Sequence, residues 1–338
     1  MENIILNKIN TQITELNSTM LCIGPMSLNI VDAAIEVSNI YNFPLMLISS
    51  RRQIDSEIFG GGYVNKWNTK SFTEYVKKKD IKKNIILARD HGGPWQNDIE
   101  IKNKLSEKDA INSAKLSFEE DINNNFDILH IDPSISPFRE TNIDRVIDNL
   151  YELYEHCYFF SKKKNKSILF EIGTEEQSSS SNNLEILDYS LSKIFQFVDK
   201  NKLIKPTFTV AQTGTKVIEF ENIGSLDSPT RVPYEIPPEI QIPILSNICK
   251  KFSIFLKAHN TDYLSNEALS WHPRLGIHAA NIAPEFGVLE TRTLYDILKT
   301  NNLNRILDNI IELSYNSKKW KKWSQAVNML CILHTHTH

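Results

Sequence analysis

The sequence has few cysteines, and their spacing does not suit a disulfide framework. The four of them, Cys22, Cys157, Cys249 and Cys331, are far apart among 338 residues and form no CxxC pair. Small domains held together by disulfides carry cysteines much more densely than this. The sequence therefore predicts reduced, mostly buried thiols, as in a cytoplasmic protein.

The chain also lacks an excess of positive charge. It contains 38 lysines and arginines against 41 aspartates and glutamates, so its formal net charge is -3. Proteins that bind nucleic acid or an anionic membrane surface by electrostatic attraction need a basic face. This balance gives no basis for either kind of partner, and we expect neither.

Long apolar runs are missing as well. None approaches the roughly 20 residues that a helix needs to span a bilayer. The first sixteen residues, MENIILNKINTQITEL, are amphipathic and carry charges throughout, whereas a signal peptide has a basic start and an uninterrupted apolar core. These features again predict a cytoplasmic protein.

The most informative stretch that is present is NIILARDHGGPWQ, residues 84–96. It opens with a short continuous apolar run, which is typical of a strand buried on both faces. The run delivers Asp90 and His91 at its end, and two glycines and a proline then stop regular structure. In parallel α/β folds, ligands bind outside the carboxyl ends of the strands, so this stretch predicts part of an active site.

The same pattern recurs along the chain. Apolar runs that predict strands occupy residues 20–24, 44–48, 85–88, 127–131, 167–172, 207–211, 253–258 and 275–278. Helical periodicity occupies residues 28–40, 69–79, 107–124, 142–163, 184–198, 240–250 and 285–299, with further helices at 303–315 and 318–332. Residues 219–238 are rich in proline and glycine and predict a long loop that covers a site.

Eight strands that alternate with helices predict an α/β protein with a single (β/α)8 barrel, the TIM barrel fold. We place the barrel at residues 19–300, after an N-terminal helix at 1–18 and before C-terminal helices and a tail at 301–338. A doubly wound sheet is the alternative. It is less favoured because polar residues follow nearly every strand rather than those beside one switch point.

A barrel brings the carboxyl ends of its strands into one ring, so side chains far apart in the sequence can meet there. The candidates at these ends are Arg51, Arg52, Asp90, His91, Asp132, Glu171, Glu175, Gln212, His259, Asp262 and Asn281. Two histidines and a carboxylate suit a divalent transition metal with an open position for substrate. Such a metal polarises a carbonyl and stabilises an enediolate, while neighbouring carboxylates move protons.

Each candidate also has a structural interpretation. Asp90 could cap the loop, and His91 and His259 could be hydrogen-bonded core imidazoles. Asp132 precedes a proline and could form a turn, while alternation leaves open which glutamate of the fifth strand faces a metal. His130 shares a strand face with Asp132 by period 2 and is a reserve candidate.

Six motifs in order carry a family resemblance, namely FGGGYVNKW, ARDHGGPWQ, LHIDPS, EIGTE, AQTGTK and KAHNTDYLSNEAL. Together they resemble the family of tagatose-bisphosphate aldolase non-catalytic subunits, over residues 29–299. That family is similar to class II ketose-bisphosphate aldolases and includes sugar-phosphate 4-epimerases. The resemblance implies a (β/α)8 barrel that acts on, or assists an enzyme of, phosphorylated sugars.

The resemblance also implies roles for single residues. Asp90 and His91 match an aldolase pair in which the aspartate is the acid–base group and the histidine binds the metal. Glu175 and His259 match further ligands, and Gln212 stands where a class II aldolase has another histidine. We therefore assign His91, Glu175, His259 and Gln212 to the metal, and Asp90, Asp132 and Glu171 to catalysis.

The chain departs from the family where a substrate would be recognised. Arg51 and Arg52 replace a more neutral stretch, and residues near 281 are more polar than the family pattern. A guanidinium group binds phosphate or carboxylate through two hydrogen bonds, which suits a sugar phosphate or a sugar acid. The residues that we assign to substrate binding are Arg51, Arg52, Gly62, Asp262 and Asn281.

Two functions follow from these features. The first is a metal-dependent enzyme that epimerises C4 of a ketose phosphate or cleaves it as an aldolase, with zinc as the favoured metal and manganese, cobalt, nickel or magnesium as alternatives. The second is a non-catalytic subunit that stabilises a class II tagatose-bisphosphate aldolase. We also expect a homo-oligomer.

Overall fold

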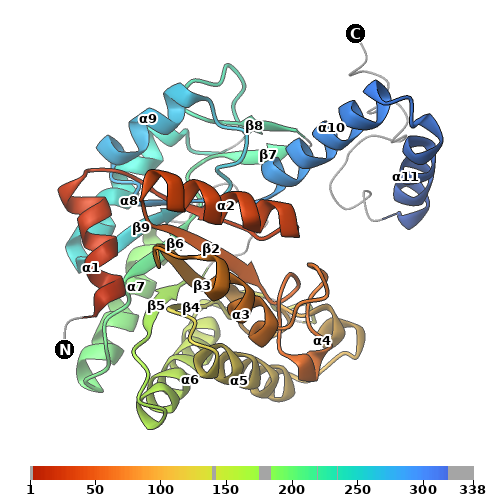
Figure 1. The fold of residues 1–338 in the computed structure, drawn as a ribbon. Helices are drawn as coiled ribbons and strands as arrows, with labels where there is room; N and C mark the ends of the chain where they lie inside the picture. Colours follow the sequence, from red (N-terminus) through yellow and green to blue (C-terminus); the bar gives the residue numbers. More distant parts are fainter. Residues whose placement is uncertain (1–2, 139–141, 175–183, 219, 234, 319–338) are drawn as a thin grey trace.

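Eight parallel strands form a closed barrel at the centre of the computed structural model, which describes residues 3–138, 142–174, 184–218, 220–233 and 235–318 (Figure 1). Around the barrel the strands run in the order β1, β10, β9, β6, β5, β4, β3, β2. Their bounds are Met20–Ile23 (β1), Leu45–Ser50 (β2), Ile85–Gly92 (β3), Ile128–Ile131 (β4), Leu169–Ile172 (β5), Phe208–Ala211 (β6), Phe255–Ala258 (β9) and Ala279–Ile282 (β10). The predicted (β/α)8 barrel is thereby confirmed.

Helices cover the outside of the barrel, as Figure 1 shows. The larger ones are Leu28–Tyr41 (α2), Thr69–Lys79 (α3), Glu107–Asn123 (α5), Ile143–Lys163 (α6), Leu184–Lys200 (α7), Pro238–Phe252 (α8), Asn266–Leu275 (α9) and Pro284–Thr300 (α10). A short helix, Asp98–Lys102 (α4), follows β3. Because the helices bury one strand face and the barrel interior buries the other, the strands consist of continuous apolar runs.

The eighth strand is the one that sequence reasoning placed wrongly. Residues 275–278 were expected to form it, whereas β10 begins at Ala279. Leu275 instead ends α9, a helix that the sequence analysis did not predict, and Gly276 caps that helix with a φ of 76°. A left-handed residue of this kind commonly ends a helix. As a result Asn281 lies within the last strand rather than after it.

Part of the stretch predicted as a long loop, residues 219–238, instead forms the second strand of a small antiparallel hairpin, Lys216–Ile218 (β7) and Glu221–Ile223 (β8). Asn222 on β8 donates from Nδ2 to the carbonyls of Asn260 and Asp262, at 2.8 Å each. The hairpin therefore supports the loop that follows β9.

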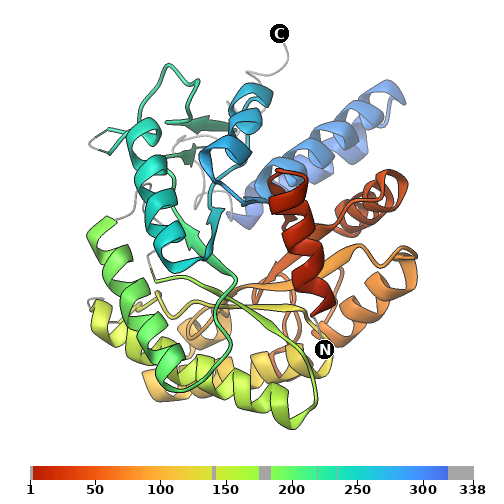
Figure 2. The ribbon, with the colours of Figure 1, turned by 90° about the vertical axis from the view of Figure 1, so that its left-hand side faces the viewer.

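The barrel interior is apolar at its amino end. We call the inward side chains there the apolar layer, and they form one buried cluster: Met20, Met46, Ile86, Ile128, Leu169, Phe208 and Ala279. Ile9 of the N-terminal helix α1 (Ile4–Asn10) and Ile13 of the π-helical turn Thr11–Glu15 belong to the same cluster. Figure 2 shows α1 in front of the barrel strands. The N-terminal segment thus closes the amino end of the barrel.

The chain continues past the barrel into α11 (Asn304–Ser317), and α10 and α11 project to one side in Figure 1. The last predicted helix, at 318–332, lies outside the described residues except for Lys318.

Three cysteines, Cys22, Cys157 and Cys249, are buried and free, as expected. None of the described helices combines the length and the apolar character needed to cross a membrane.

Candidate metal centre

Two histidines from opposite parts of the sequence meet at the carboxyl ends of the strands. His91 lies near the end of β3, and His259 directly follows β9. Their Nε2 atoms are 3.1 Å apart, and the rings meet edge to face at 80°. His91 has a φ of 46°, in the left-handed region that non-glycine residues rarely occupy. Strained backbone of this kind gathers at functional sites, where the surrounding structure enforces it.

Asp132 holds the ring of His91 from behind. Its Oδ2 lies 2.7 Å from His91 Nδ1, and its Oδ1 accepts hydrogen bonds from the backbone and the side chain of Ser134, at 3.1 and 2.5 Å. Gln96 Nε2 donates to the same Oδ2 at 3.1 Å. Burial alone would raise the pKa of Asp132, but the bond to His91 lowers it to about 2. Asp132 is thus a fixed carboxylate that orients His91, and its expected catalytic role stays a prediction.

His259 is held in a similar way by an amide. Gln212 Nε2 lies 3.2 Å from His259 Nδ1, and Gln212 Oε1 accepts a hydrogen bond from Asn260 at 2.7 Å. Gln212 therefore stands behind His259, and its expected role as a metal ligand stays a prediction. Burial lowers the pKa of His259, and the positive charge of His91 adds to this, giving about 4. For His91, burial lowers the pKa, but the carboxylates of Asp90, Asp132 and Glu171 together outweigh burial and raise it to about 9.

This arrangement fits a divalent metal. Nitrogen ligands about 2.0–2.1 Å from a tetrahedral zinc lie roughly 3.4 Å apart, close to the separation of the two Nε2 atoms. Histidine ligands also usually have the other ring nitrogen bonded to a carboxylate or an amide, as both have here. Asp90 Oδ2 lies 3.7 Å from His91 Nε2 and offers an oxygen. Glu175, expected as a further ligand, lies outside the described residues.

A layer of buried charge lies directly beneath. We call Asp90, His130, Glu171 and Lys257 the charged layer; they continue the inward faces of β3, β4, β5 and β9 by period 2. Lys257 Nζ binds both oxygens of Glu171, at 2.9 and 2.8 Å, and both side chains are fully buried. Glu171, expected to be catalytic, is thus paired below the site. Burial lowers the pKa of Lys257, but the charge and hydrogen bonds of Glu171, together with the charge of Asp90, act against burial, and the net effect is a raised pKa.

Arg51 belongs to a second buried cluster, outside the barrel. Its Nε binds Asp55 at 3.0 Å, its Nη1 binds Glu100 at 2.6 Å, and Nη1 also donates to the carbonyl of Gly93 at 2.9 Å. Glu100 in turn accepts the backbone N–H of Trp95 at 2.5 Å. The guanidinium is 1% exposed and engaged by these partners, and the expectation that Arg51 binds substrate stays a prediction. Its contacts fix the loop after β3.

The other expected substrate residues have different surroundings. Arg52 is partly exposed and pairs with Asp98 at 2.6 Å. Gly62 lies against the backbone of Gln53, where an added Cβ would come within 1.9 Å of the carbonyl oxygen, so close packing explains this glycine. Asp262 accepts the backbone N–H groups of Ala283 and Glu285 at 2.9 Å each and so caps the start of α10.

Asn281 remains a good candidate for substrate binding. It is 7% exposed, and both polar atoms of its amide are buried with no hydrogen-bond partner in the described part of the chain. A buried polar atom without a partner costs about 1–3 kcal/mol, so such atoms call for an explanation. Its place on the inward face of β10 suits a polar ligand in the barrel mouth.

Sequence reasoning missed Lys257 and Gln96. Lys257 lies two residues before His259 and so shares its strand face, a signal that alternation carries and that was available. Gln96 could not have been found in this way because it reaches Asp132 from an irregular loop.

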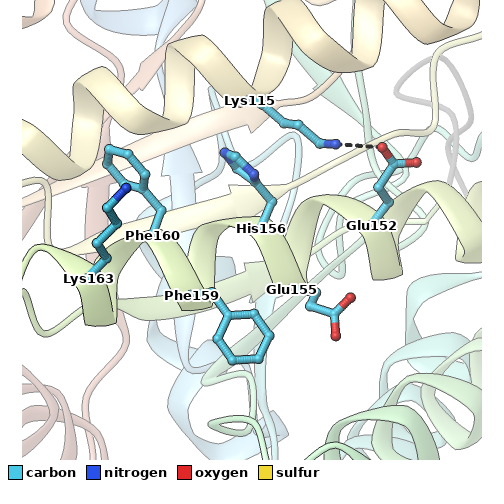
Figure 3. A pocket seen from close by; sticks show the side chains of 7 residues that line it. All are labelled: Lys115, Glu152, Glu155, His156, Phe159, Phe160 and Lys163. Carbon is cyan, nitrogen blue, oxygen red and sulfur yellow. Dashed lines mark hydrogen bonds and ion pairs between the residues drawn. The ribbon is translucent and has the colours of Figure 1, made fainter.

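A separate groove lies on the outer helices, far from these residues in the fold. It has a volume of about 560 Å³, and its lining comes from α5 and α6: Lys115, Glu152, Glu155, His156, Phe159, Phe160 and Lys163 (Figure 3). Lys115 and Glu152 form an ion pair of 2.6 Å across it. The groove faces outward and shares no residue with the histidine site.

Comparisons with known proteins agree with the fold. No family model matches the chain, and no curated protein matches it in sequence. A probable tagatose 6-phosphate kinase from Sinorhizobium meliloti 1021 is similar in structure, with a TM-score of 0.72 at 17% identity over 94% of this chain and 80% of that one. Fructose-bisphosphate aldolase from Campylobacter jejuni has a TM-score of 0.57 at 14% identity, covering 88% and 81%.

The YdjI aldolase from Escherichia coli K12 has a TM-score of 0.53 at 13% identity, covering 89% of this chain and 88% of that one. At such identities the similarity shows the fold alone. The chain therefore shares its barrel with aldolases, which is the fold that the sequence resemblance implies.

Proposed function

We propose that this chain is a metal-dependent enzyme that breaks the C3–C4 bond of a ketose phosphate, either to invert C4 or to release the two fragments. The observation that carries the proposal is the pair of Nε2 atoms 3.1 Å apart at the carboxyl ends of β3 and β9. The sharing of the barrel with aldolases supports the same reaction class. Nothing in the arrangement is specific to one sugar.

His91 and His259 would hold the metal, with Asp90 as a nearby oxygen donor and zinc as the favoured ion. When bound, the metal polarises the substrate carbonyl and stabilises the negative charge that develops beside it. Asp132 and Gln212 keep the two imidazoles in place. This supporting role explains why Asp132 and Gln212 each contact the Nδ1 atom of a histidine, on the side of the ring away from the metal.

Asp90 is the group that we propose moves the proton. Burial alone would raise its pKa, but the positive charges of His91 and Lys257 hold it well below its usual range, so the carboxylate is ionised. Its Oδ1 has no hydrogen-bond partner in the described part of the chain. It can therefore accept the proton of the C4 hydroxyl as the C3–C4 bond breaks, which leaves an aldehyde and an enediolate.

The fate of the aldehyde separates the two outcomes. If it turns its other face and the bond forms again, Asp90 returns the proton to the C4 oxygen and the product is an epimer. If it leaves, the reaction is an aldol cleavage. Arg52 and Asn281 are the residues that we propose recognise the substrate.

A non-catalytic role as the stabilising subunit of an aldolase is the second candidate. The observation that favours it is the position of Gln212, an amide bonded to His259 where the resemblance to class II aldolases implies another histidine. In that case the chain would raise the activity of a separate aldolase and have none of its own. The expectation of a homo-oligomer stays a prediction.

The test is a turnover screen on the purified, zinc-reconstituted protein with ketose monophosphates and bisphosphates, following both epimer formation and triose release. His91→Ala should lose activity at least about a thousandfold while its melting temperature stays within a few degrees. Met26, a partly buried residue packed against the main hydrophobic cluster, supplies the control, and Met26→Leu should keep full activity. Turnover that survives in His91→Ala would contradict the assignment.

A further inference from the structure

The imidazole of His130 has a defined tautomer because of a backbone contact. His130 lies on β4 and is 1% exposed. The backbone N–H of His91 donates to its Nδ1 at 3.2 Å. Glu171 Oε1 also lies 3.4 Å from Nδ1, but it already accepts a hydrogen bond from Lys257. A nitrogen that accepts an N–H carries no proton of its own, so with this contact in place neutral His130 would carry its proton on Nε2.

That Nε2–H group is buried and has no partner. Among the described residues no acceptor lies within hydrogen-bond distance of it. A buried donor normally finds an acceptor, so an orphaned one in the barrel mouth points to a group that is supplied from outside the chain.

Space for such a group is kept open by a glycine. A Cβ added to Gly173, which follows β5, would lie 2.5 Å from His130 Nε2 and 3.7 Å from the Cγ of Asp132. Any larger residue would therefore fill the position in front of the N–H. Because Asp132 holds His91, the space lies beside the metal centre rather than deep in the barrel.

The same contact removes His130 from the set of metal ligands. His130, Asp90 and His91 offer ligand atoms within 4.8 Å of one another, which suggests a three-residue site. However, the lone pair of His130 Nδ1 is already used by the His91 N–H, and Nε2 carries the proton. Neither nitrogen has a lone pair free for a metal, so His130 acts as a hydrogen-bond donor.

We propose that His130 is a further catalytic residue, whose Nε2–H donates a hydrogen bond to the C4 oxygen of the substrate. Asp90 Oδ1 lies 3.7 Å from the other ring nitrogen, Nδ1, and is likewise buried without a hydrogen-bond partner in the described part of the chain, so the barrel mouth holds both an unused acceptor and an unused donor. A hydroxyl group satisfies both. This inference rests on the proposed function and assigns one oxygen of its substrate.

The proton on Nε2 stays there throughout. Asp90 takes the hydroxyl proton and the electron pair of the C3–C4 bond moves to the enediolate, so the C4 oxygen becomes a carbonyl oxygen. When the bond forms again, negative charge returns to that oxygen, and a fixed N–H donor stabilises it until Asp90 gives the proton back. The step needs no other reactant.

Two variants distinguish the loss of the His130 Nε2–H donor from the loss of the contact between His130 Nδ1 and the His91 backbone N–H. Asn at position 130 keeps an acceptor near the His91 N–H but withdraws the donor at Nε2, whereas Gln places an N–H near the Nε2 position. We expect His130→Asn to lower kcat by about a hundredfold or more, the usual effect of removing one such donor, with zinc affinity changed less than about threefold. His130→Gln should recover at least about tenfold of the loss. Equal kcat values for wild type and His130→Asn, or a loss of zinc that matches the loss of turnover, would overturn the proposal.

A second measurement does not depend on turnover. In protein labelled with ¹⁵N-histidine, the His130 ring should show a protonated Nε2 and an unprotonated Nδ1, and the Nε2 proton should shift when D-tagatose 6-phosphate or D-fructose 6-phosphate is added. A protonated Nδ1 would overturn the inference whatever the enzyme does. Turnover with an unshifted Nε2 proton would overturn the role of His130 alone, whereas absence of turnover and of any shift with either sugar would overturn both this role and the proposed function.

Discussion

The two ends of the barrel interior differ in chemistry although the same strands build both. At the amino end the apolar layer and the N-terminal segment form a closed apolar cluster. Further along β3, β4, β5 and β9, the inward positions of the charged layer hold Asp90, His130, Glu171 and Lys257. At the amino end burial is favourable by itself, whereas at the carboxyl end each charge needs a partner to be tolerated.

This difference indicates that the carboxyl end of the barrel interior can accommodate charged functional groups. The hydrogen bonds of the sheet are the same in both halves, so the apolar layer can maintain the barrel while the other half carries charge. The pairing of Lys257 with Glu171 places a neutral pair under the histidines. Stability and chemistry should therefore respond separately to substitutions in the two halves.

The largest effect is expected from breaking the buried ion pair. Lys257→Met leaves Glu171 as an uncompensated buried charge and should lower the free energy of unfolding by about 3–5 kcal/mol. Urea denaturation monitored by circular dichroism measures the change. The double variant Lys257→Met/Glu171→Leu should recover most of it, and a double variant as unstable as the single one would show that packing, not charge, is responsible.

A truncation in the apolar layer should affect stability alone. Met46 is fully buried there, and Met46→Ala should cost about 3 kcal/mol through lost burial and the cavity that remains. Zinc affinity of the folded protein, measured by calorimetry below the unfolding transition, should stay within about twofold. A substantial loss of affinity would mean that the two halves are not independent.

A substitution of Arg51 tests whether the loop after β3 positions His91. Arg51→Lys keeps the charge but cannot bind Asp55, Glu100 and the Gly93 carbonyl together, so zinc affinity should fall about tenfold, within the range for residues that support ligands. Arg89→Lys is the matched control, because Arg89 is equally buried but pairs with Asp121 on α5. Similar losses of affinity in both variants would contradict a specific role for Arg51.

The smallest effect concerns pH. Burial lowers the pKa of His272 on α9 to about 4, below its ordinary value of 6.5. Above pH 6.5 the residue is neutral in both states and has no effect, but as the pH falls toward 4 the unfolded state binds a proton that the folded state does not. The free energy of unfolding should thus fall by about 1 kcal/mol between pH 6.5 and 5.5. Denaturation at both pH values should show a smaller difference for His272→Gln, and an equal difference would exclude this cause.

Much of the fold could be predicted because buried strands with polar ends leave a clear pattern. Asp90 and His91 follow such a run, and His259 follows another, so the histidine pair was accessible to sequence reasoning. The eighth strand was misplaced because residues 275–278 resemble a short strand, whereas Leu275 ends helix α9 and Gly276 caps it. Helix α9 itself was not recognised.

Charged residues were harder to place than apolar ones. Arg51 was expected at the substrate because a sequence shows a charge but not the buried carboxylates of Asp55 and Glu100 that neutralise it. Glu171 was expected in catalysis for a similar reason, since its partner Lys257 comes from a strand 86 residues away. Which charges pair is decided by tertiary structure, and the local pattern does not contain that information.

The most direct test of the metal centre is the zinc content of the purified protein after reconstitution and removal of free metal, measured by plasma mass spectrometry. The account predicts about one zinc per chain in the wild type and in Met46→Ala, and almost none in His91→Ala/His259→Ala with its fold retained. Full zinc content in the double histidine variant, or none in the wild type, would contradict a metal centre formed by these two histidines.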